Sequence, residues 1–360
     1  MQITHDLAIG GLQQVVVNLC KSIDRERFDI SVLCLRALGD FVQDLEEIGV
    51  PVFFIEQPQS GTDYFSFLKV AKILRQQKIE VIHTHNTQPL LDGTIAYLMS
   101  GVKKIIHTDH ARAFPDKKRY MVAEKIASFF VDKMVGVSDD TKNNLYDFEK
   151  IALEKLEVIH NGIDINRYKK GIDLTAKRKE LKIKDSGPII GMVGRLSEEK
   201  GVVFLIKALP KILQRIPDLN LVIAGDGPQK DLLRNEISKL DITNNVKVLG
   251  SRLDIPEILN LLDILVLPSL REGLPMVLLE AMAAGCAIIA SNVGGIPTLI
   301  KDNWNGNLVS PGSIDEIANA VINLVSNEAK QKEYSKNSET ILDEFSLSNM
   351  VHKYESLYLI

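Results

Sequence analysis

Two glutamates, Glu272 and Glu280, lie inside a segment of apolar and small residues, SLREGLPMVLLEAMAAGCAIIASNVGG (residues 269–295). The preceding run DILVLPS is typical of a buried strand, and MVLLEAMAAG has the pattern of a helix that ends at Gly285. Glu272 is therefore expected in the loop above a strand, and Glu280 in the second turn of the next helix. A helix start favours a diphosphate, and nearby carboxylates accept hydrogen bonds from sugar hydroxyls. The segment predicts a nucleotide-sugar pocket.

A second candidate group lies in GMVGRLSEEKG, where Arg195 and Lys200 follow a predicted strand that ends near Gly194. Two cations five residues apart beside a helix start can hold a chain of phosphates, since Arg195 offers a planar fork and Lys200 a point charge. The same residues would also fit an ordinary surface, with one cation paired to Glu198 or Glu199. The pattern alone leaves both interpretations open.

The third candidate is AIGGLQQVV, in which Gly10 and Gly11 separate the first predicted strand from the first predicted helix. Glycine lets the backbone approach an anion closely, although a tight turn without a ligand would favour it equally. The dinucleotide pattern GxGxxG is not completed here or elsewhere, and no Walker loop is present. These absences count against a dehydrogenase and against a P-loop enzyme.

Composition narrows the class of protein further. The chain has 360 residues, of which 45% are hydrophobic and 25% charged, and its net charge is −4. These values are typical of a folded protein and give no electrostatic surface for nucleic acid. The three cysteines, Cys20, Cys34 and Cys286, form no CxxC pair, which argues against a disulfide framework. A reducing compartment is therefore expected. No signal-peptide pattern or apolar run of eighteen residues occurs, so we expect a cytoplasmic protein.

Short apolar runs alternate with helical patterns along the whole chain, which is typical of α/β domains with parallel sheets. The runs of the first half are DISVLCL, VPVFFI, EVIHTH, KKIIHT and DKMVGVS, and those of the second half are PIIGMVG, LNLVIAG, NVKVLG, DILVLPS and CAIIASN. Apolar density falls and charge rises between residues 164 and 187. We therefore predict two doubly wound domains that meet in this region.

Taken together, these segments resemble the retaining nucleotide-sugar glycosyltransferases of family 4, which have the GT-B fold. EGLPMVLLE is similar to their E-x7-E motif, and GRLSEEKG is similar to their Arg/Lys phosphate motif. The other matching segments are IGGLQQVVVNL, EVIHTHN, VIHNGID and VIAGDGP. The order and spacing of these motifs make the resemblance specific over nearly the whole chain.

The resemblance implies two Rossmann-like domains with parallel sheets that face each other across a cleft. Residues 1–165 would form an acceptor-binding domain, residues 166–187 a linker, and residues 188–345 a donor-binding domain. The segment SLSNMVHKYESLYLI would form a helix, at about residues 346–360, that crosses back onto the first domain.

The resemblance also assigns roles to single residues. Glu280 would hold the ribose hydroxyls, Glu272 the hydroxyls of the donor sugar, and Arg252, in GSRLD, would contact the base. The implied donor-binding residues are Gly10, Gly11, Gly194, Arg252, Gly273, Leu274, Pro275 and Glu280. The implied catalytic residues are His110, Arg195, Lys200 and Glu272, and Arg112 is an implied acceptor contact.

The activity implied is transfer of a hexose-type sugar from a nucleotide diphosphate sugar to a hydroxyl acceptor, with retention of anomeric configuration. Uridine diphosphate sugars are the commonest donors in the family, and polysaccharide or glycolipid synthesis is the expected setting. The sequence has no D-x-D triplet, so we expect no metal and no other cofactor. A non-catalytic nucleotide-sugar-binding protein of the same fold, or a phosphorylase or epimerase of that fold, remains an alternative.

Two further features concern partners and histidines. Residues 103–133 have a local net charge of +4 and interleaved aromatic residues, so they would suit an anionic membrane surface on the inner face of the plasma membrane or, equally, a solvated helix face. We interpret His83, His85, His107 and His160, at or near strand ends, as structural. His110 is assigned a functional role only because it matches the histidine of the family.

Overall fold

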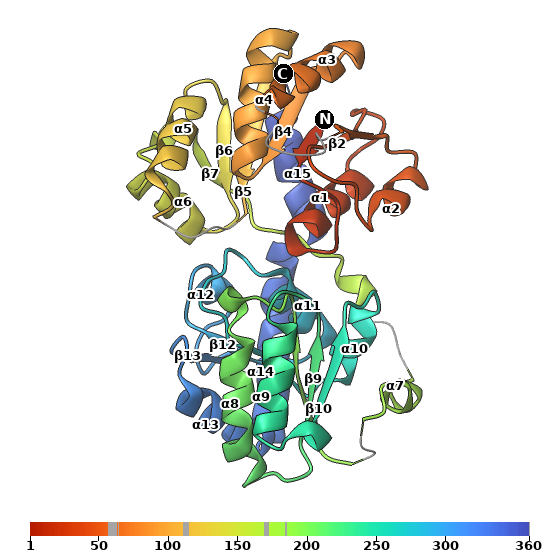
Figure 1. The fold of residues 1–360 in the computed structure, drawn as a ribbon, viewed down its shortest axis with the longest axis vertical. Helices are drawn as coiled ribbons and strands as arrows, with labels where there is room; N and C mark the ends of the chain where they lie inside the picture. Colours follow the sequence, from red (N-terminus) through yellow and green to blue (C-terminus); the bar gives the residue numbers. More distant parts are fainter. Residues whose placement is uncertain (57–62, 64, 111–114, 169–172, 184–185, 360) are drawn as a thin grey trace. The chain divides into compact units, whose positions relative to one another are not determined.

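The computed structural model describes residues 1–56, 63, 65–110, 115–168, 173–183 and 186–359. The chain divides into two compact units. The first unit comprises residues 1–162 and 347–360, and the second comprises residues 163–346. Each unit is built around one parallel sheet with helices packed around it (Figure 1).

The first unit contains a seven-stranded sheet in the order β3-β2-β1-β4-β5-β6-β7, and each described pairing is parallel. The strands are β1 (Gln2–Thr4), β2 (Val32–Cys34), β3 (Val52–Phe54), β4 (Val81–His85), β5 (Lys104–Asp109), β6 (Lys133–Gly136) and β7 (Leu156–Val158). The helices are α1 (Gly11–Ser22), α2 (Val42–Glu46), α3 (Ser66–Gln76), α4 (Thr87–Ser100), α5 (Lys118–Ser128), α6 (Asp139–Asp147), η1 (Leu153–Lys155) and α15 (Leu347–Tyr358).

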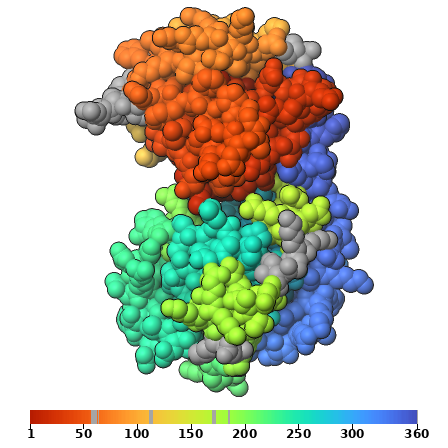
Figure 2. Space-filling model, turned by 90° about the vertical axis from the view of Figure 1, so that its right-hand side faces the viewer, coloured from red at the N-terminus to blue at the C-terminus, as the bar shows by residue number. Residues whose placement is uncertain are grey.

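Burial explains why the first sheet forms. Ile3, Ile82 and Ile105 of three neighbouring strands lie in one apolar core with residues of α3 and α4. Strands covered by helices on both faces lose contact with water along their whole length, which accounts for their continuous apolar runs. The last helix, α15, contacts α1 and β5, so residues from the two ends of the chain lie side by side in this unit (Figure 2).

The second unit contains a six-stranded parallel sheet in the order β10-β9-β8-β11-β12-β13. The strands are β8 (Ile189–Val193), β9 (Asn220–Ala224), β10 (Val246–Gly250), β11 (Ile264–Leu267), β12 (Ala287–Ser291) and β13 (Asn307–Val309). The helices are η2 (Ile165–Arg167), α7 (Leu174–Glu180), η3 (Glu198–Lys200), α8 (Val202–Leu213), α9 (Lys230–Lys239), η4 (Thr243–Asn245), α10 (Ile255–Leu261), α11 (Met276–Ala284), α12 (Ile296–Leu299), α13 (Ile314–Val325), α14 (Glu328–Leu342) and η5 (Asp343–Phe345).

Both sheets have the doubly wound topology that the sequence predicts. In each, the strand order reverses beside the first strand, between β1 and β4 in the first unit and between β8 and β11 in the second. In open α/β sheets, ligands commonly bind at the carboxyl edge beside such a reversal, because the loops that follow the two strands lead to opposite faces. This edge is therefore the place to look for ligand-binding residues in each unit.

The stretch that we predicted as a linker, residues 166–187, belongs to the second unit. It includes most of η2 and all of α7, which contacts α10 (Figure 2). Tyr168, Leu181 and Ile183 are buried. The few apolar residues of this charged stretch thus attach it to the second unit, while α15 belongs to the first.

In the part of the chain that the structure describes, no helix combines the length and the apolar character needed to cross a membrane.

Candidate active site

Lys200 and Glu272 come together at the point where the strand order of the second sheet reverses. Lys200 ends the turn η3 after β8, and Glu272 lies between β11 and α11. Because β8 and β11 are parallel neighbours, the loops that follow them begin side by side. Lys200 Nζ donates to Glu272 Oε1 at 2.6 Å and to Oε2 at 2.8 Å. The sequence placed both residues after strands, and the sheet order makes them an ion pair.

The Glu272 carboxylate is held by a further hydrogen bond. Ser269 Oγ donates to Glu272 Oε1 at 2.6 Å. The side chain of Glu272 is only 7% exposed, whereas that of Lys200 is 22% exposed. A charge removed from water in this way needs partners, and the lysine and the serine provide them. The pair is fixed in position while the lysine keeps some access to solvent.

Glycines allow the loops that follow β8 and β12 to approach the loop that follows β11. Gly201 has a φ of 61°, and a Cβ atom there would overlap the carbonyl oxygen of Pro268. Gly294 has a φ of 53°, and a Cβ atom there would overlap the carbonyl oxygen of Glu272. The amide of Leu270 also donates to the carbonyl of Glu199 at 2.7 Å. Only glycine tolerates these combinations of conformation and contact.

Arg195 lies in the same loop as Lys200, but in a different environment. Its side chain is exposed and makes no hydrogen bond or ion pair with any described residue. The neighbouring Glu199 accepts from Ser197 Oγ at 2.7 Å. Partial burial acts to raise the pKa of Glu199, but this hydrogen bond and the nearby cations lower it on balance. Arg195 is thus a cation still available to an external anion.

Glu280 lies in the second turn of α11, as its position in the sequence predicts. Its Oε1 atom accepts a hydrogen bond from Tyr168 Oη at 2.9 Å. Burial raises the pKa of the Glu280 carboxyl, while Tyr168 and Arg167 act in the opposite direction. The turn before α11 contains the other predicted donor contacts of this segment, which are buried: Gly273, Leu274 and Pro275.

Arg252, the predicted contact for the base, already has acidic partners. Its guanidinium donates through Nε to Asp254 Oδ1 at 2.7 Å, and through Nη2 to Asp254 Oδ2 at 2.6 Å and Glu180 Oε1 at 2.8 Å. Lys177 contacts the same two carboxylates. The hydrogen bonds from Arg252 hold the pKa of Asp254 well below its usual range, despite partial burial. A base at this loop would therefore meet a guanidinium that is already neutralised.

The three remaining predicted glycines lie at helix and strand ends. Gly194 directly follows β8 with a φ of 150°, and its amide donates to the carbonyl of Ala224 at 3.0 Å. In the first unit Gly10 is the residue before α1 and Gly11 is its first residue, which is exposed. A Cβ atom on Gly10 would overlap Gln13 Oε1. All three thus lie at the carboxyl edge of a sheet.

His110 directly follows β5 in the first unit and is buried. Its Nε2 atom lies 2.9 Å from Nδ1 of His85, and its amide donates to Asn86 Oδ1 at 3.1 Å. Asn86 follows β4 at the reversal of this sheet and has a φ of 64°, a strained value for a residue other than glycine. Burial lowers the pKa of His110 to about 3. Arg112, the predicted acceptor contact, lies outside the described residues.

Comparison with known proteins decides the family. A model described as glycosyl transferases group 1 matches residues 173–340, and one described as Glycosyltransferase Family 4 matches residues 9–167. The chain is 30% identical to the UDP-Gal:alpha-D-GlcNAc-diphosphoundecaprenol alpha-1,3-galactosyltransferase of Escherichia coli, over 98% of this chain and 94% of that protein. The chain belongs to glycosyltransferase family 4. The present chain is also 27% identical to the N-acetyl-alpha-D-glucosaminyl L-malate synthase of Bacillus anthracis, over 81% of the chain and 77% of that protein.

Solved structures agree with this assignment. The crystal structure of HepE from Anabaena in complex with UDP and glucose covers 100% of this chain and 99% of its own, with a TM-score of 0.89 and 26% identity. The complex of the same protein with UDP-glucose has a TM-score of 0.88 and covers 99% and 98%. The predicted GT-B fold is confirmed for this glycosyltransferase.

Besides Ser269, Tyr168 is the residue of the site that we did not predict from the sequence. It lies four residues after the segment VIHNGID, in the stretch that we predicted as a linker. The sequence feature that could have identified Tyr168 is an aromatic residue in an otherwise charged segment. Its partner Glu280 is 112 positions away in the chain, so no local pattern links the two.

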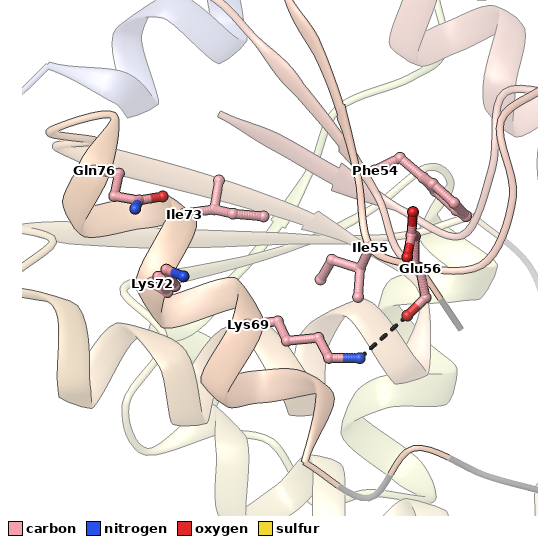
Figure 3. Close-up of a pocket in the computed structure, with 7 residues that line it drawn as sticks. All are labelled: Phe54, Ile55, Glu56, Lys69, Lys72, Ile73 and Gln76. Carbon is pink, nitrogen blue, oxygen red and sulfur yellow. Dashed lines mark hydrogen bonds between the residues drawn. The ribbon is translucent and has the colours of Figure 1, made fainter. Parts of the chain in front are cut away.

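Two other features of this glycosyltransferase do not involve the predicted site residues. An open pocket lies between the edge strand β3 and α3, lined by Phe54, Ile55, Glu56, Lys69, Lys72, Ile73 and Gln76 (Figure 3). Its position at the edge of the sheet is away from the strand reversal. Among the described residues, no group of three or more His, Cys, Asp or Glu side chains is arranged to hold a metal ion.

Proposed function

We propose that this chain is a retaining hexosyltransferase that moves a sugar from a uridine diphosphate sugar to a hydroxyl group of a lipid-linked or polysaccharide acceptor. Cell-surface polysaccharide or glycolipid synthesis is the proposed setting. The observation that carries the proposal is the ion pair of Lys200 and Glu272 at the strand reversal of the second sheet. There, a cation for the diphosphate and a carboxylate for the sugar hydroxyls lie in contact.

The hydrogen bonds of this pair leave capacity for a ligand. Glu272 Oε1 accepts from both Lys200 and Ser269, and Oε2 accepts from Lys200. A carboxylate has about four lone-pair sites, and an ammonium group has three N–H donors. Oε2 therefore retains a site for a sugar hydroxyl, and Lys200 retains an N–H for a phosphate oxygen. Both functions can be served without breaking the pair.

The relatives support the choice of donor and acceptor. The name of the E. coli relative specifies UDP-galactose as donor and a diphosphoundecaprenol-linked sugar as acceptor. The HepE structures contain UDP with glucose, or UDP-glucose. We therefore propose a UDP-hexose donor and a lipid-linked sugar as the first acceptor to test for this chain.

We propose that the reaction needs no divalent metal. Arg195 and Lys200 would offset the charge of the leaving diphosphate, and Arg195 has no described partner to displace. Removal of one group that stabilises developing charge in this way raises the activation barrier by about 3 kcal/mol. Removal of divalent metals with EDTA should leave turnover unchanged.

The proposed step is displacement on one face of the sugar. The acceptor oxygen forms a bond to the anomeric carbon while the bond from that carbon to the diphosphate oxygen breaks. The diphosphate departs with the electron pair, and one of its oxygens takes the proton of the acceptor hydroxyl. The anomeric configuration is then retained.

The experiment is a transfer assay with UDP-galactose, UDP-glucose and UDP-N-acetylglucosamine, each offered a polyprenyl-diphosphate-linked N-acetylglucosamine. UDP release is measured with and without EDTA, and proton NMR reads the anomeric configuration of the first-formed product. An inverted product would contradict the displacement step, and loss of turnover in EDTA would contradict metal independence. Tight UDP binding without transfer to any acceptor would favour the non-catalytic alternative.

We further propose that α4 and α5 attach the first unit to an anionic membrane. The exposed apolar side chains here, which we call the α4–α5 face, are Ile95, Leu98, Met99, Val122, Ile126, Phe129 and Phe130. Those of α4 and α5 recur at helical spacing, Phe129 and Phe130 directly follow α5, and the two helices are in contact. Lys117, Lys118, Arg119 and Lys125 flank them. Apolar side chains rimmed by cations suit an anionic headgroup layer, where a lipid-linked acceptor would be found.

Vesicle flotation tests the membrane proposal. We expect the protein to float with phosphatidylglycerol-containing vesicles and not with phosphatidylcholine vesicles, and Ile126→Glu to abolish flotation. Leu232→Glu is the matched control, because Leu232 is also a half-exposed residue on a helix, but in the second unit. Failure of the wild-type protein to float with either vesicle, or equal loss in both variants, would contradict the proposal.

A further inference from the structure

A chain of buried hydrogen bonds connects His110 to the last helix of the protein. His85 Nδ1 lies 2.9 Å from His110 Nε2, and His85 Nε2 lies 2.8 Å from Gln2 Oε1. Gln2 Nε2 donates to Tyr358 Oη at 3.1 Å, and Tyr358 Oη lies 2.6 Å from His83 Nδ1. These five residues are all buried and belong to the first unit. None of the links depends on how the two units are placed.

The direction of each hydrogen bond follows from Gln2. Its Oε1 atom can only accept, so Nε2 of His85 carries a proton and donates. Burial and the neighbouring histidines lower the pKa of His85, so its ring is neutral and carries one proton. Nδ1 of His85 must then accept from Nε2 of His110. The proton of the neutral His110 ring is consequently on Nε2, and Nδ1 has a lone pair.

The rest of the chain agrees with this direction. The Gln2 amide donates to Tyr358, which leaves the hydroxyl proton of Tyr358 for Nδ1 of His83. Nε2 of His83 can then donate to Thr108 Oγ1, which lies 2.7 Å away. The opposite orientation of the Gln2 amide would reverse every donor and place a proton on Nδ1 of His110. That atom is buried without an acceptor among the described residues, and an orphaned N–H there would be costly.

We propose that Gln2 is a positioning residue that, through His85, keeps the proton of His110 on Nε2 and leaves Nδ1 of His110 as a hydrogen-bond acceptor for a substrate hydroxyl. Nδ1 has no hydrogen-bond partner in the described part of the chain, and His110 lies at the carboxyl edge of the first sheet. A sugar hydroxyl is a donor of the kind that this atom lacks. The substrate half of this inference rests on the proposed function, whereas the tautomer does not.

Tyr358 gives the last helix a part in the same arrangement. Its hydroxyl accepts from the Gln2 amide and connects Gln2 to His83, and it lies at the end of α15. Loss of its hydroxyl would leave Gln2 Nε2 without its partner and His83 Nδ1 without its donor. The C-terminal helix would thus help to set the protonation of a residue that belongs to a different part of the chain.

The tautomer can be measured directly on the whole protein. Long-range proton–nitrogen NMR of protein labelled with nitrogen-15 in histidine distinguishes a proton on Nδ1 from one on Nε2. The His110 signals are assigned by their absence in His110→Asn. We expect Nε2–H at both His110 and His85 in the wild-type protein. A proton on Nδ1 of His110 would overturn the inference, whatever the activity of the protein.

Variants then test the role of Gln2. Gln2→Met removes the acceptor at similar length, and we expect His110 to lose its single tautomer and kcat/KM for transfer to fall about 10- to 100-fold, as for other partners that orient functional histidines. The affinity for UDP should not change, which separates this effect from general damage. Unchanged His110 signals in a folded Gln2→Met protein would overturn the proposal.

The matched control is Thr84→Val. Thr84 is buried on the same strand as His85, and its hydroxyl lies 2.9 Å from Nδ1 of His107, outside the chain that leads to His110. We expect the His110 signals to be unchanged in this variant. If the NMR results hold but no acceptor is ever glycosylated, the proposed function fails while the positioning role of Gln2 stands.

Discussion

At the scale of single residues, the pairing of Lys200 with Glu272 leads to the first prediction. In Lys200→Met the nearly buried carboxylate of Glu272 loses two of its three hydrogen bonds. We expect the free energy of unfolding of the second unit to fall by about 1–3 kcal/mol, below the range for fully buried pairs because Lys200 retains contact with water. We expect kcat to fall about 100-fold or more. Urea unfolding and initial rates of UDP release measure the two effects.

A second lysine provides the control for this variant. Lys211 pairs with Asp315 at 2.7 Å in the same unit, but both side chains are exposed. Exposed pairs contribute about 0–1 kcal/mol, so Lys211→Met should change neither stability nor rate appreciably. Equal losses in the two lysine variants would remove the special role of Lys200.

The hydroxyl of Tyr168 predicts a pH effect on donor binding. Its hydrogen bond lowers the pKa of Glu280, whereas burial raises it. Tyr168→Phe should therefore raise the pKa of Glu280 further. The predicted role of Glu280, accepting ribose hydroxyls, requires its carboxylate form. UDP affinity should therefore weaken as pH falls through this pKa, and the midpoint should lie at a higher pH in Tyr168→Phe. Calorimetric titration with UDP over a range of pH measures it.

Tyr334 supplies a matched control for the tyrosine variant. It is buried in the core of the second unit, and its hydroxyl has no partner among the described residues. Removal of an unpaired buried hydroxyl does not sacrifice a hydrogen bond. Tyr334→Phe should thus leave the pH dependence of UDP binding unchanged, and a midpoint that moves as much as in Tyr168→Phe would contradict the assignment.

At the scale of elements, Gly201 decides how closely the loop after β8 approaches the loop after β11. Gly201→Ala combines a left-handed backbone, which costs about 1–2 kcal/mol, with an overlap that costs about 1–3 kcal/mol more. Gly312→Ala is the control, since Gly312 has a φ of 76° but a Cβ atom there would make only ordinary contacts. Urea unfolding should show the larger loss for Gly201→Ala. Equal losses would mean that the approach of the loops is not tight.

The strands that carry these loops could be predicted from the sequence. The runs that form β8 and β11 were recognised because strands buried on both faces are continuously apolar. A hydrophobic pattern relates only residues that are close in the chain, so it does not predict the long-range hydrogen bonds of the site. Tyr168 and Gln2 act through partners far away in the chain, and Arg252 is engaged by Glu180, which lies in the predicted linker. No periodicity reports such contacts.

At the scale of the whole molecule, Trp304 allows the units to be followed separately. It is the only tryptophan of the chain and lies in the second unit. UDP at 100 times its Kd should stabilise the native state by about 2.7 kcal/mol through mass action. The thermal transition seen by tryptophan fluorescence should therefore shift upward with UDP, and by less in Lys200→Met. The absence of any shift at saturating UDP would count against a donor site in this unit.

The sequence by itself determined the family, the alternation of strands and helices, and the positions of Lys200, Glu272 and Glu280 after particular strands. These properties depend on residue types at short spacing, which a chain displays without folding. The tertiary structure alone decided that Lys200 meets Glu272, that Tyr168 donates to Glu280, and that Gln2 reaches His110 through His85. Those contacts depend on the order of strands in each sheet, which brings together residues that are remote in the chain.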